Sequence, residues 1–491
     1  MDANAYRRFV PLLAWVIVIT ALLFIPFKII SYGFLPMDDA LRHAAKTISG
    51  KSWPEILVMK DSVRIDPSPG WQQILEWVHA VGGGGAEALV VFSVVALMAL
   101  MFFSALPWLR RPEAWLAALC LAALFAPECT TRLARGRPYL LTQAVLITIL
   151  FIWSRNDKSW PGRMGLLLTT LLVAASAWIH GSWYLLCLPG LAIFLTGRWQ
   201  SSIVYGLCWL GGSFLGCALT GHPLEFMVQA VDHLKGAFGG ISVARVLVPE
   251  FRPSDGNTSV IVLVGMLVLW RAITPGWNPR RLLSPFFMLM LLGWVLGLKV
   301  NRFWWDWGLP AFIGWMALEF QNWFELYLPQ DSIKRVFIAL ALAFVVCLGF
   351  TSDRENRWTA SLTTEYVTPE TPGIAGWLPG PGGIVYNSTM DAFFQTFFKN
   401  PTADWRYVHG FEPGLMCPED LEVLRRIQWN FGDARAYEPW IKKLRPEDRI
   451  FIGGSSGSRP GIPELEWKYA VTGLWIGRLP QPPNNADANA R

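Results

Sequence analysis

The chain carries few charged residues for its length. Lys, Arg, Asp and Glu make up 16% of its 491 residues, whereas about 25% is usual for a soluble protein. Hydrophobic residues contribute 53%. This balance excludes a disordered chain and an ordinary soluble enzyme, and it indicates a polytopic membrane protein.

Basic runs and cysteine motifs are scarce as well. The net charge is only +6 and the basic residues are scattered, which argues against a nucleic-acid partner. The seven Cys show no Cys-x-x-Cys or Cys/His spacing, so we expect no essential protein-held metal and no other cofactor. We also expect no cleavable signal peptide, because the apolar run over 9–30 is too long for one and has no cleavage site after it.

Eleven apolar runs predict transmembrane helices, because a spanning helix needs roughly 20 mostly apolar residues. The runs cover residues 9–30, 86–108, 113–127, 138–153, 164–180, 182–197, 202–220, 257–271, 282–298, 308–323 and 335–351. We therefore expect an α-helical polytopic membrane domain over residues 1–351, with a long outer loop at 31–85. Residues 352–491 should form a soluble α/β domain, since probable strands at 384–386, 449–452 and 471–476 alternate with helical stretches at 390–399 and 419–429.

Loop charges predict the orientation of the chain. Short loops on the N-terminal side are denser in Lys and Arg, as at Arg110-Arg111 and Arg280-Arg281, which places the N-terminus in the cytoplasm. An odd number of helices then places the C-terminal domain in the periplasm of a bacterial inner membrane. All six His fall on the outer side of this map. Either the greater length of the outer segments or polar chemistry at the outer face accounts for that bias.

The most informative local pattern follows the first predicted helix, in the stretch from Pro36 to Trp53. Asp39 is suited to cap a helix that Gly50 ends, and an apolar face of Leu and Ala predicts that this helix lies along the membrane surface. A cap needs only one carboxylate, and a second one at a membrane interface is costly unless it is solvated or paired. We therefore favour Asp38 slightly over Asp39 as the functional carboxylate.

This stretch resembles the first outer loop of the C-type glycosyltransferases (GT-C). The resemblance is greatest to enzymes that use polyprenyl-phosphate sugars, such as lipid A aminoarabinose transferases and protein O-mannosyltransferases. Three later stretches are similar to family motifs in the same order. Asp66 to Trp71 takes the place of a His-Pro-Pro-rich segment whose His is absent here, Arg137 to Thr142 resembles an Arg-Pro-Asp-like helix start, and His180-Gly181 before Leu188-Pro189-Gly190 resembles a Lys-Gly and Leu-Pro-Gly pattern.

The resemblance implies transfer of a sugar from a polyprenyl-phosphate lipid to an acceptor hydroxyl of a lipid, glycan or protein. It assigns the general base to Asp38 or Asp39, although some relatives bind a divalent cation, and Asp38 is then a ligand instead. Cations must stabilise the departing phosphate, and the planar donor fork of Arg suits that task. The candidates are Arg132, Arg135 and Arg137, whose alternative role is to bind headgroups of the surrounding membrane lipids.

Four weaker candidates complete the predicted substrate-binding set: Arg42, His43, His180 and Arg302. Arg302 lies beside Asp306 and a cluster of Trp residues at 304, 305 and 307. Such rings can stack on a sugar, but Trp is also enriched in every interfacial belt, which is the interpretation we favour.

Two other classes of protein remain open at this stage. A lipid transporter or flippase would prefer ionisable residues at the middle of the membrane and broken helices, whereas the predicted helix interiors carry almost no charge. A non-catalytic membrane scaffold for envelope assembly is favoured if neither Asp38 nor Asp39 lines an outer cavity.

Overall fold

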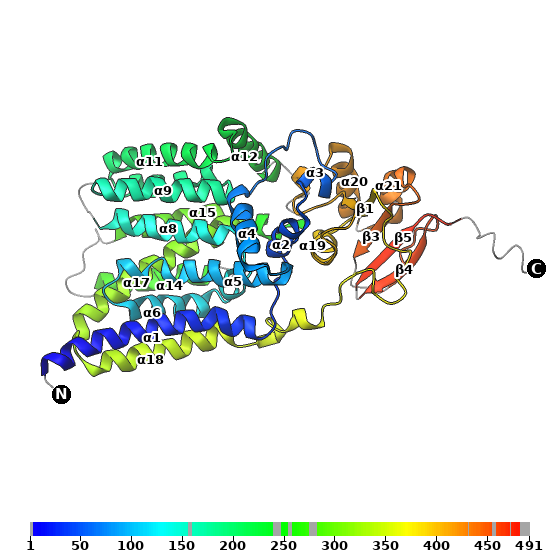
Figure 1. Ribbon diagram of the computed structural model, residues 1–491. Helices are drawn as coiled ribbons and strands as arrows, with labels where there is room; N and C mark the ends of the chain where they lie inside the picture. Colours follow the sequence, from blue (N-terminus) through cyan, green and yellow to red (C-terminus); the bar gives the residue numbers. More distant parts are fainter. Residues whose placement is uncertain are drawn as a thin grey trace, which may run out of the picture.

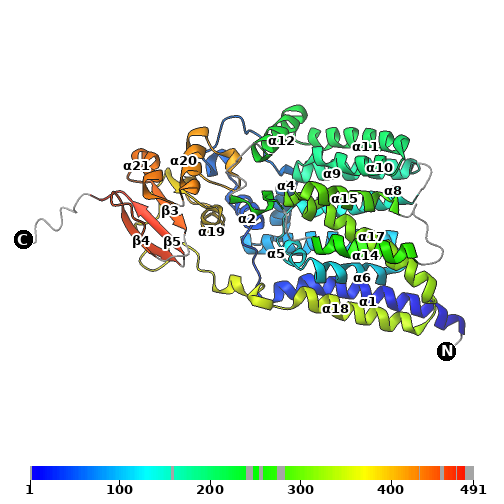
Figure 2. The same cartoon turned by 180° about the vertical axis from the view of Figure 1, so that it is seen from behind.

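The helical part of the molecule is a bundle of roughly parallel helices, and a small α/β unit lies at one end of it (Figures 1 and 2). The computed structural model describes residues 3–155, 160–238, 247–253, 258–273, 282–430, 432–453, 458–471 and 473–481. The N-terminus lies at the opposite end of the bundle from the α/β unit (Figure 1). This arrangement agrees with a chain whose N-terminal helix begins on the side of a membrane opposite to the α/β unit.

Each of the eleven predicted segments contains a helix. The helices are α1 (Ala3–Ser31), α5 (Ala86–Phe103), α6 (Pro112–Phe125), α8 (Tyr139–Ser154), α9 (Arg163–His180), α10 (Leu188–Leu195), α11 (Trp199–Ala218), α14 (Thr258–Ile273), α15 (Pro285–Gly297), α17 (Leu309–Tyr327) and α18 (Ile333–Thr351). Within the described residues, five spans are long and apolar enough to cross a membrane: Phe9–Ser31, Ala86–Trp108, Arg163–His180, Trp199–Ala218 and Ile333–Thr351. The helical assignment is confirmed, and the crossing of the other six remains a prediction.

Large apolar side chains cover the outside of the bundle. Leu207 on α11 and Phe337 and Phe344 on α18 are each about two-thirds exposed. In water such faces would favour aggregation, whereas lipid tails cover them without cost. Inside the bundle, small residues bring helices together: a Cβ atom on Gly212 or Gly216 of α11 would clash with the backbone of α9.

Short helices gather at the end of the bundle that faces the α/β unit (Figure 1). They are α2 (Asp39–Ser49), α3 (Trp53–Ile56), α4 (Pro69–Gly82), α7 (Glu128–Leu133), α12 (Pro223–Phe238), the 3₁₀ turn η3 (Pro249–Phe251), α16 (Asn301–Phe303) and the π-helical turn η5 (Trp304–Gly308). Most of the residues singled out from the sequence lie on or beside these elements.

The α/β unit is built on a five-stranded mixed sheet. The strands are β1 (Gly383–Asn387), β2 (Trp405–Tyr407), β3 (Arg449–Gly453), β4 (Glu466–Val471) and β5 (Leu474–Arg478), in the order β2-β1-β3-β5-β4. Strand β1 runs parallel to β2 and β3, and β5 is antiparallel to β3 and β4. The helices α19 (Met390–Lys399), α20 (Pro418–Trp429) and α21 (Glu438–Lys443) accompany the sheet.

The predicted class of this unit is confirmed, but one predicted strand is wrong. The apolar run 471–476 is not a single strand, because it contains the turn between β4 and β5. Gly473 in that turn has a φ of 81°, a backbone conformation that glycine adopts at little cost and that ends a strand. Strand β2 was not predicted, because its three residues are too few to show a periodicity.

The loop that follows α3 extends the sheet. The backbone N–H of Val58 donates to the carbonyl of Tyr407 at 2.8 Å, and the N–H of Lys60 donates to the carbonyl of Leu415 at 3.0 Å. Leu57 and Met59 form bridges with Tyr407 and Met416 on either side of these bonds. The loop thereby covers the free edge of β2 and fixes the α/β unit over the end of the bundle.

Candidate active site

Asp38, and not Asp39, is the N-cap residue of α2. Its backbone is extended, and its carboxylate oxygen Oδ1 accepts a hydrogen bond from the backbone N–H of Asp39 at 2.6 Å. The assignment of the cap to Asp39 was therefore wrong, because the helix begins one residue earlier than the sequence suggests. Gly50 ends the helix as predicted, with a φ of 64° that favours glycine.

The apolar face of α2 is covered by protein instead of lying on a membrane surface. Leu41, Ala44 and Ala45 are fully buried, and α2 packs against α4 and α5 on the bundle side and against α19 of the α/β unit. The prediction of an interfacial helix is wrong in this respect, because the sequence alone does not show that a second layer covers it. This packing fixes the position and direction of the Asp38–Asp39 pair.

Three predicted arginines converge on one carboxylate that the sequence analysis did not single out. Oxygen Oε1 of Glu250 lies 2.7 Å from Nη1 of Arg132, 3.2 Å from Nη1 of Arg135 and 2.8 Å from Nη1 of Arg137. Arg132 belongs to α7, and the other two follow it in the turn before α8. Glu250 belongs to η3, more than a hundred residues away in the chain, so no local sequence pattern predicts the contact.

Each of these arginines has a second carboxylate. Nε and Nη2 of Arg137 donate to Asp38 at distances of 2.7–3.0 Å, and Nη1 of Arg135 lies 3.6 Å from Asp38. Nη2 of Arg132 donates to Oδ1 of Asp306 at 2.8 Å. Arg132 and Arg137 are therefore each held at two points by different nitrogens, whereas both contacts of Arg135 come from Nη1.

Asp306 links a further arginine to this network. Its Oδ2 accepts from Nε of Arg302 at 3.0 Å, and it is almost fully buried within η5. Single π-helical turns of this kind are frequent at functional sites. Trp304, Trp305 and Trp307 of the same turn are buried inside the protein, so the favoured assignment of this cluster to an interfacial belt is wrong.

The ion pairs hold Asp39 and Glu250 in their charged form. Burial favours a raised pKa for Asp39, but the positive charges of Arg42 and Arg137 outweigh it and bring the pKa below its ordinary value. Burial also favours a raised pKa for Glu250. The positive charges of Arg137 and Arg132 outweigh this effect, so the pKa of Glu250 lies below its ordinary value as well. Both groups are therefore negatively charged at neutral pH.

The described cluster carries a small positive excess. Five arginines face four carboxylates, so one positive charge remains unbalanced. The arginines are Arg42, Arg132, Arg135, Arg137 and Arg302, and the carboxylates are Asp38, Asp39, Glu250 and Asp306.

A cavity of about 260 Å³ joins these groups to the α/β unit. The bundle side contributes both aspartates, and Met390, Phe394 and the segment 411–415 line it from the α/β unit. Of the predicted site residues, six line this cavity: Asp38, Asp39, Arg42, Arg137, His180 and Arg302.

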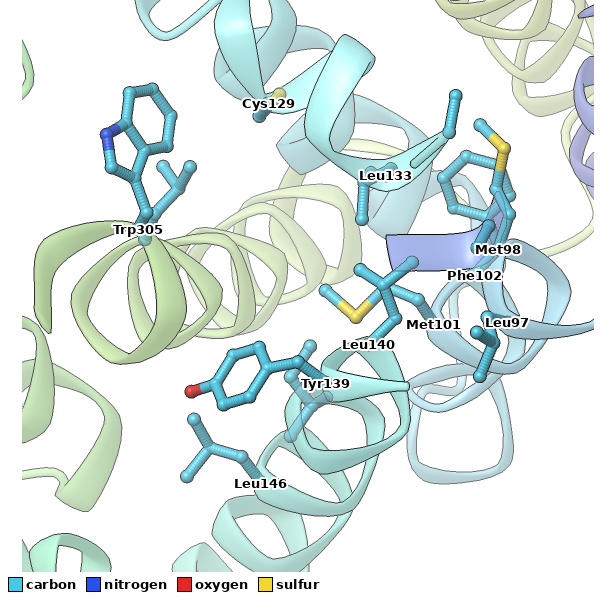
Figure 3. Packing of buried hydrophobic residues seen from close by; sticks show 14 of the residues in the cluster. Leu97, Met98, Met101, Phe102, Cys129, Leu133, Tyr139, Leu140, Leu146 and Trp305 are labelled. Atoms are coloured by element: carbon cyan, nitrogen blue, oxygen red, sulfur yellow. The ribbon is translucent and has the colours of Figure 1, made fainter. Parts of the chain in front are cut away.

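A smaller cavity of about 60 Å³ reaches from the same cluster towards apolar side chains of the bundle. Arg132 and Arg135 line it, and it shares Arg137 with the larger cavity. Figure 3 shows its apolar side, where Met101, Leu133, Leu140 and Trp305 lie among other buried side chains. Charged groups and an apolar lining thus meet at one place.

Arg42 connects the bundle to the α/β unit. Its Nε donates to Asp39 at 2.7 Å, and its guanidinium lies 3.8 Å from the ring centre of Phe411 and 5.6 Å from that of Trp53. The two rings are themselves in contact at 4.7 Å. A residue of the C-terminal unit therefore helps to hold the partner of Asp39.

The two predicted histidines lie in different surroundings. Nδ1 of His180 is 2.7 Å from Oγ of Ser182, its ring contacts Tyr139, and it lines both cavities. His43 is fully buried and, within the described chain, is absent from the lining of either cavity. Burial, reinforced by the charge of Arg42, lowers the pKa of His43 to about 3. His43 is thus placed to support α2 and not to contact a ligand.

The donor set does not fit a divalent cation. Asp38 and Asp39 are each paired with arginine, so a cation would have to compete with guanidinium groups. Among the residues that the structure describes, no three His, Cys, Asp or Glu side chains gather in a way that could hold a metal ion. We route no chemical step through a metal.

Fold and site together define a helical protein with membrane-length apolar helices, a charged cavity at one end of the bundle and an α/β unit over that cavity. A search of solved structures finds similarity to the arabinofuranosyltransferase AftD from mycobacteria, at 15% sequence identity and a TM-score of 0.49. The match covers 97% of this chain and 40% of that one, so the chain spans well under half the length of AftD. No family model and no curated protein matches the chain.

Proposed function

We propose that the chain is a membrane glycosyltransferase of GT-C type that acts at the periplasmic face of a bacterial inner membrane. It transfers a sugar from a polyprenyl-phosphate lipid to a hydroxyl of a lipid, glycan or protein acceptor. The observation that carries the proposal is the larger cavity, which brings Asp38 and Asp39 together with Arg137 and Arg302 beneath the α/β unit.

The reaction needs a base beside the acceptor hydroxyl, and Asp39 suits this role better than Asp38. Asp38 caps α2 and binds Arg137 in a bidentate manner. Asp39 lines both cavities and makes its short contact, to Arg42, through one oxygen. Its other oxygen lies 3.8 Å from Nε of Arg137 and remains available to accept a proton.

The step balances as a displacement at the anomeric carbon. The acceptor oxygen forms a bond to that carbon, its proton passes to Asp39, and the bond between the carbon and the phosphate oxygen breaks with its electron pair on the phosphate. Arg132, Arg135 and Arg137 would stabilise the charge that develops on the leaving group. The apolar side chains around the smaller cavity, Met101 and Leu140 among them, would receive the first carbons of the lipid.

The α/β unit is placed to contact the acceptor. Phe394 and the segment 411–415 form the wall of the larger cavity opposite the bundle. Phe394 is nearly buried while also lining the cavity. Sugars stack well on such rings, so a glycan acceptor is in keeping with this wall.

The alternatives fit the structure less well. A non-catalytic scaffold was favoured only if neither aspartate lines an outer cavity, and both do. A transporter needs its ionisable residues near the middle of the helices, whereas the cavity charges lie at helix ends, with Asp38 before α2, Arg137 before α8 and His180 at the end of α9.

The direct test is transfer by the purified full-length protein. It is incubated with a panel of polyprenyl-phosphate sugars and a membrane extract as the source of acceptors, and release of polyprenyl phosphate is measured. Release that depends on both the protein and the extract supports the proposal. If no member of the panel is consumed, while each is bound or translocated intact, the chain is not a transferase of this class.

A further inference from the structure

One carboxylate oxygen in the charged cluster accepts hydrogen bonds from three arginines. Oε1 of Glu250 lies within 3.2 Å of guanidinium nitrogens from Arg132, Arg135 and Arg137. Three arginine forks around a single anionic oxygen are the arrangement that binds a phosphate group. The position is already filled by a side chain of the protein itself.

The arginines do not depend on Glu250 alone for their positions. Nη2 of Arg132 also lies 2.8 Å from Oδ1 of Asp306, and Nη2 of Arg137 also lies 2.7 Å from Oδ2 of Asp38. These two partners lie on the π-helical turn before α17 and at the start of α2, both packed in the bundle. If the carboxylate of Glu250 leaves, the donors of Arg132 and Arg137 therefore remain in place, and Nη1 of Arg135 stays near Asp38 at 3.6 Å.

The charge of the cluster favours such an exchange. With Glu250 present, five arginines and four carboxylates leave a charge of +1. Without it the cluster carries +2, which matches the charge of about −1.5 to −2 on a phosphate monoester at neutral pH. A polyprenyl phosphate becomes such a monoester when the sugar has been transferred.

We propose that Glu250 is an internal substitute for the lipid phosphate, which occupies the arginine site in the empty protein and is displaced when the phosphate group binds. This inference rests on the proposed function and adds a residue that controls access to its donor site. In the empty state the carboxylate offsets part of the positive charge that three arginines bring together in a partly buried place. In the bound state the phosphate oxygens take over the same donors.

The proposal makes Glu250 a competitor of the donor. An internal ligand leaves the site free in only a fraction of the molecules. The apparent affinity for phosphate is the intrinsic affinity multiplied by that fraction. Removal of the internal ligand should therefore tighten binding. The expected gain for Glu250→Gln is about 5- to 150-fold, the usual range of coupling between two ligands of one protein.

The experiment measures binding of undecaprenyl phosphate, without a sugar, to the full-length protein in nanodiscs. Wild type, Glu250→Gln and the matched control Glu319→Gln are compared. Glu319 forms a similar pair with Arg271 at 2.7 Å, and it is absent from the described lining of both cavities. Inorganic phosphate and phosphatidic acid are titrated in parallel, and the relative gain shows which source of phosphate the site prefers.

Tighter binding by Glu250→Gln, with no change for Glu319→Gln, supports the exchange. Equal or weaker binding by Glu250→Gln overturns it while leaving the transferase proposal intact, since wild type still binds the lipid. Binding by neither protein overturns both proposals.

A second measurement does not depend on how the variant folds. An experimental structure of wild type with undecaprenyl phosphate should show the phosphate on Arg132, Arg135 and Arg137 with Glu250 moved away. A structure in which Glu250 still contacts all three arginines would contradict the inference.

Discussion

The guanidinium of Arg137 binds the carboxylate of Asp38 through two nitrogens. Nη2 lies 2.7 Å and Nε lies 3.0 Å from Oδ2. The contact joins the turn before α8 to the N-cap residue of α2, 99 positions earlier in the chain. It also separates two roles within the acidic pair. Asp38 positions an arginine and caps a helix, and Asp39 is left facing the cavities.

Arg137→Ala should impair use of the lipid donor. It removes donors that are expected to contact the phosphate, and a hydrogen bond to a charged group contributes about 1.5–3 kcal/mol. We expect the KM for the polyprenyl-phosphate sugar to rise about tenfold or more. The KM for the acceptor should change little, and both constants are read from initial rates of transfer.

Two further variants give this prediction its controls. Arg137→Lys keeps the charge but loses the planar fork, so its donor KM should lie between those of wild type and Arg137→Ala. Arg271→Ala breaks an arginine–glutamate pair away from the cavities and should leave the donor KM unchanged. An unaltered donor KM in Arg137→Ala would remove this arginine from the phosphate site.

Phe411→Ala should affect the acceptor more than the donor. The ring lies over Arg42 and lines the larger cavity from the α/β unit. A cation–π contact contributes about 0.5–2 kcal/mol, so we expect the KM for the acceptor to rise between about 2-fold and 30-fold. Tyr469→Ala, which alters a half-exposed ring of β4, is the matched control. A change confined to the donor KM would contradict an acceptor role for this wall.

The pH profile should depend on Arg42. Because the pKa of Asp39 lies below its ordinary value, the base stays ionised and kcat should be constant down to about pH 4, near the usual Asp pKa. The ion pair also stabilises the fold above that pH, and this contribution is lost as the pH falls through the lowered pKa.

The variant Arg42→Gln removes the nearest cation while burial continues to raise the pKa of Asp39. The acid limb of kcat should therefore move to higher pH, measured from pH 4 to pH 8. An acid limb at the same pH in wild type and Arg42→Gln would show that Asp39 is not the titrating base.

The orientation can be tested with a reporter fused after Arg491. The N-terminus and the α/β unit lie at opposite ends of the bundle (Figure 2), and loop charges place the N-terminus in the cytoplasm. We expect alkaline phosphatase at this fusion site to be active, because it folds only in the periplasm. A reporter active only in the cytoplasm would contradict the topology.

Sequence patterns predicted the helices well and the site in part. Long apolar runs such as 9–30 and 335–351 indicate helices because their composition alone decides the structure in a membrane. The residues from Arg132 to Arg137 were found because three arginines near a helix start have a clear chemical use. Their true partner, Glu250, was missed because it is a lone carboxylate in a long loop.

Long-range packing explains the remaining errors. The apolar face of α2 has the pattern of an interfacial helix, and only the position of α19 shows that protein covers it. The Trp residues of η5 have the composition of a belt, yet they are buried between helices. In both cases the composition correctly predicts an apolar face. The element that covers this face comes from a distant part of the chain, so the local sequence does not show whether lipid or protein lies against it.

The central claim is that Asp39 is the base of a sugar transfer, and the rate of transfer by Asp39→Asn tests it most directly. The substitution keeps the size of the side chain and removes its charge. We predict that kcat falls by about 10²- to 10⁴-fold, while binding of undecaprenyl phosphate is retained. Asp38→Asn should cause a smaller fall in kcat with a raised donor KM, because it loosens Arg137. If Asp39→Asn transfers a lipid-linked sugar at the full wild-type rate, Asp39 is not the base and the proposed mechanism is wrong.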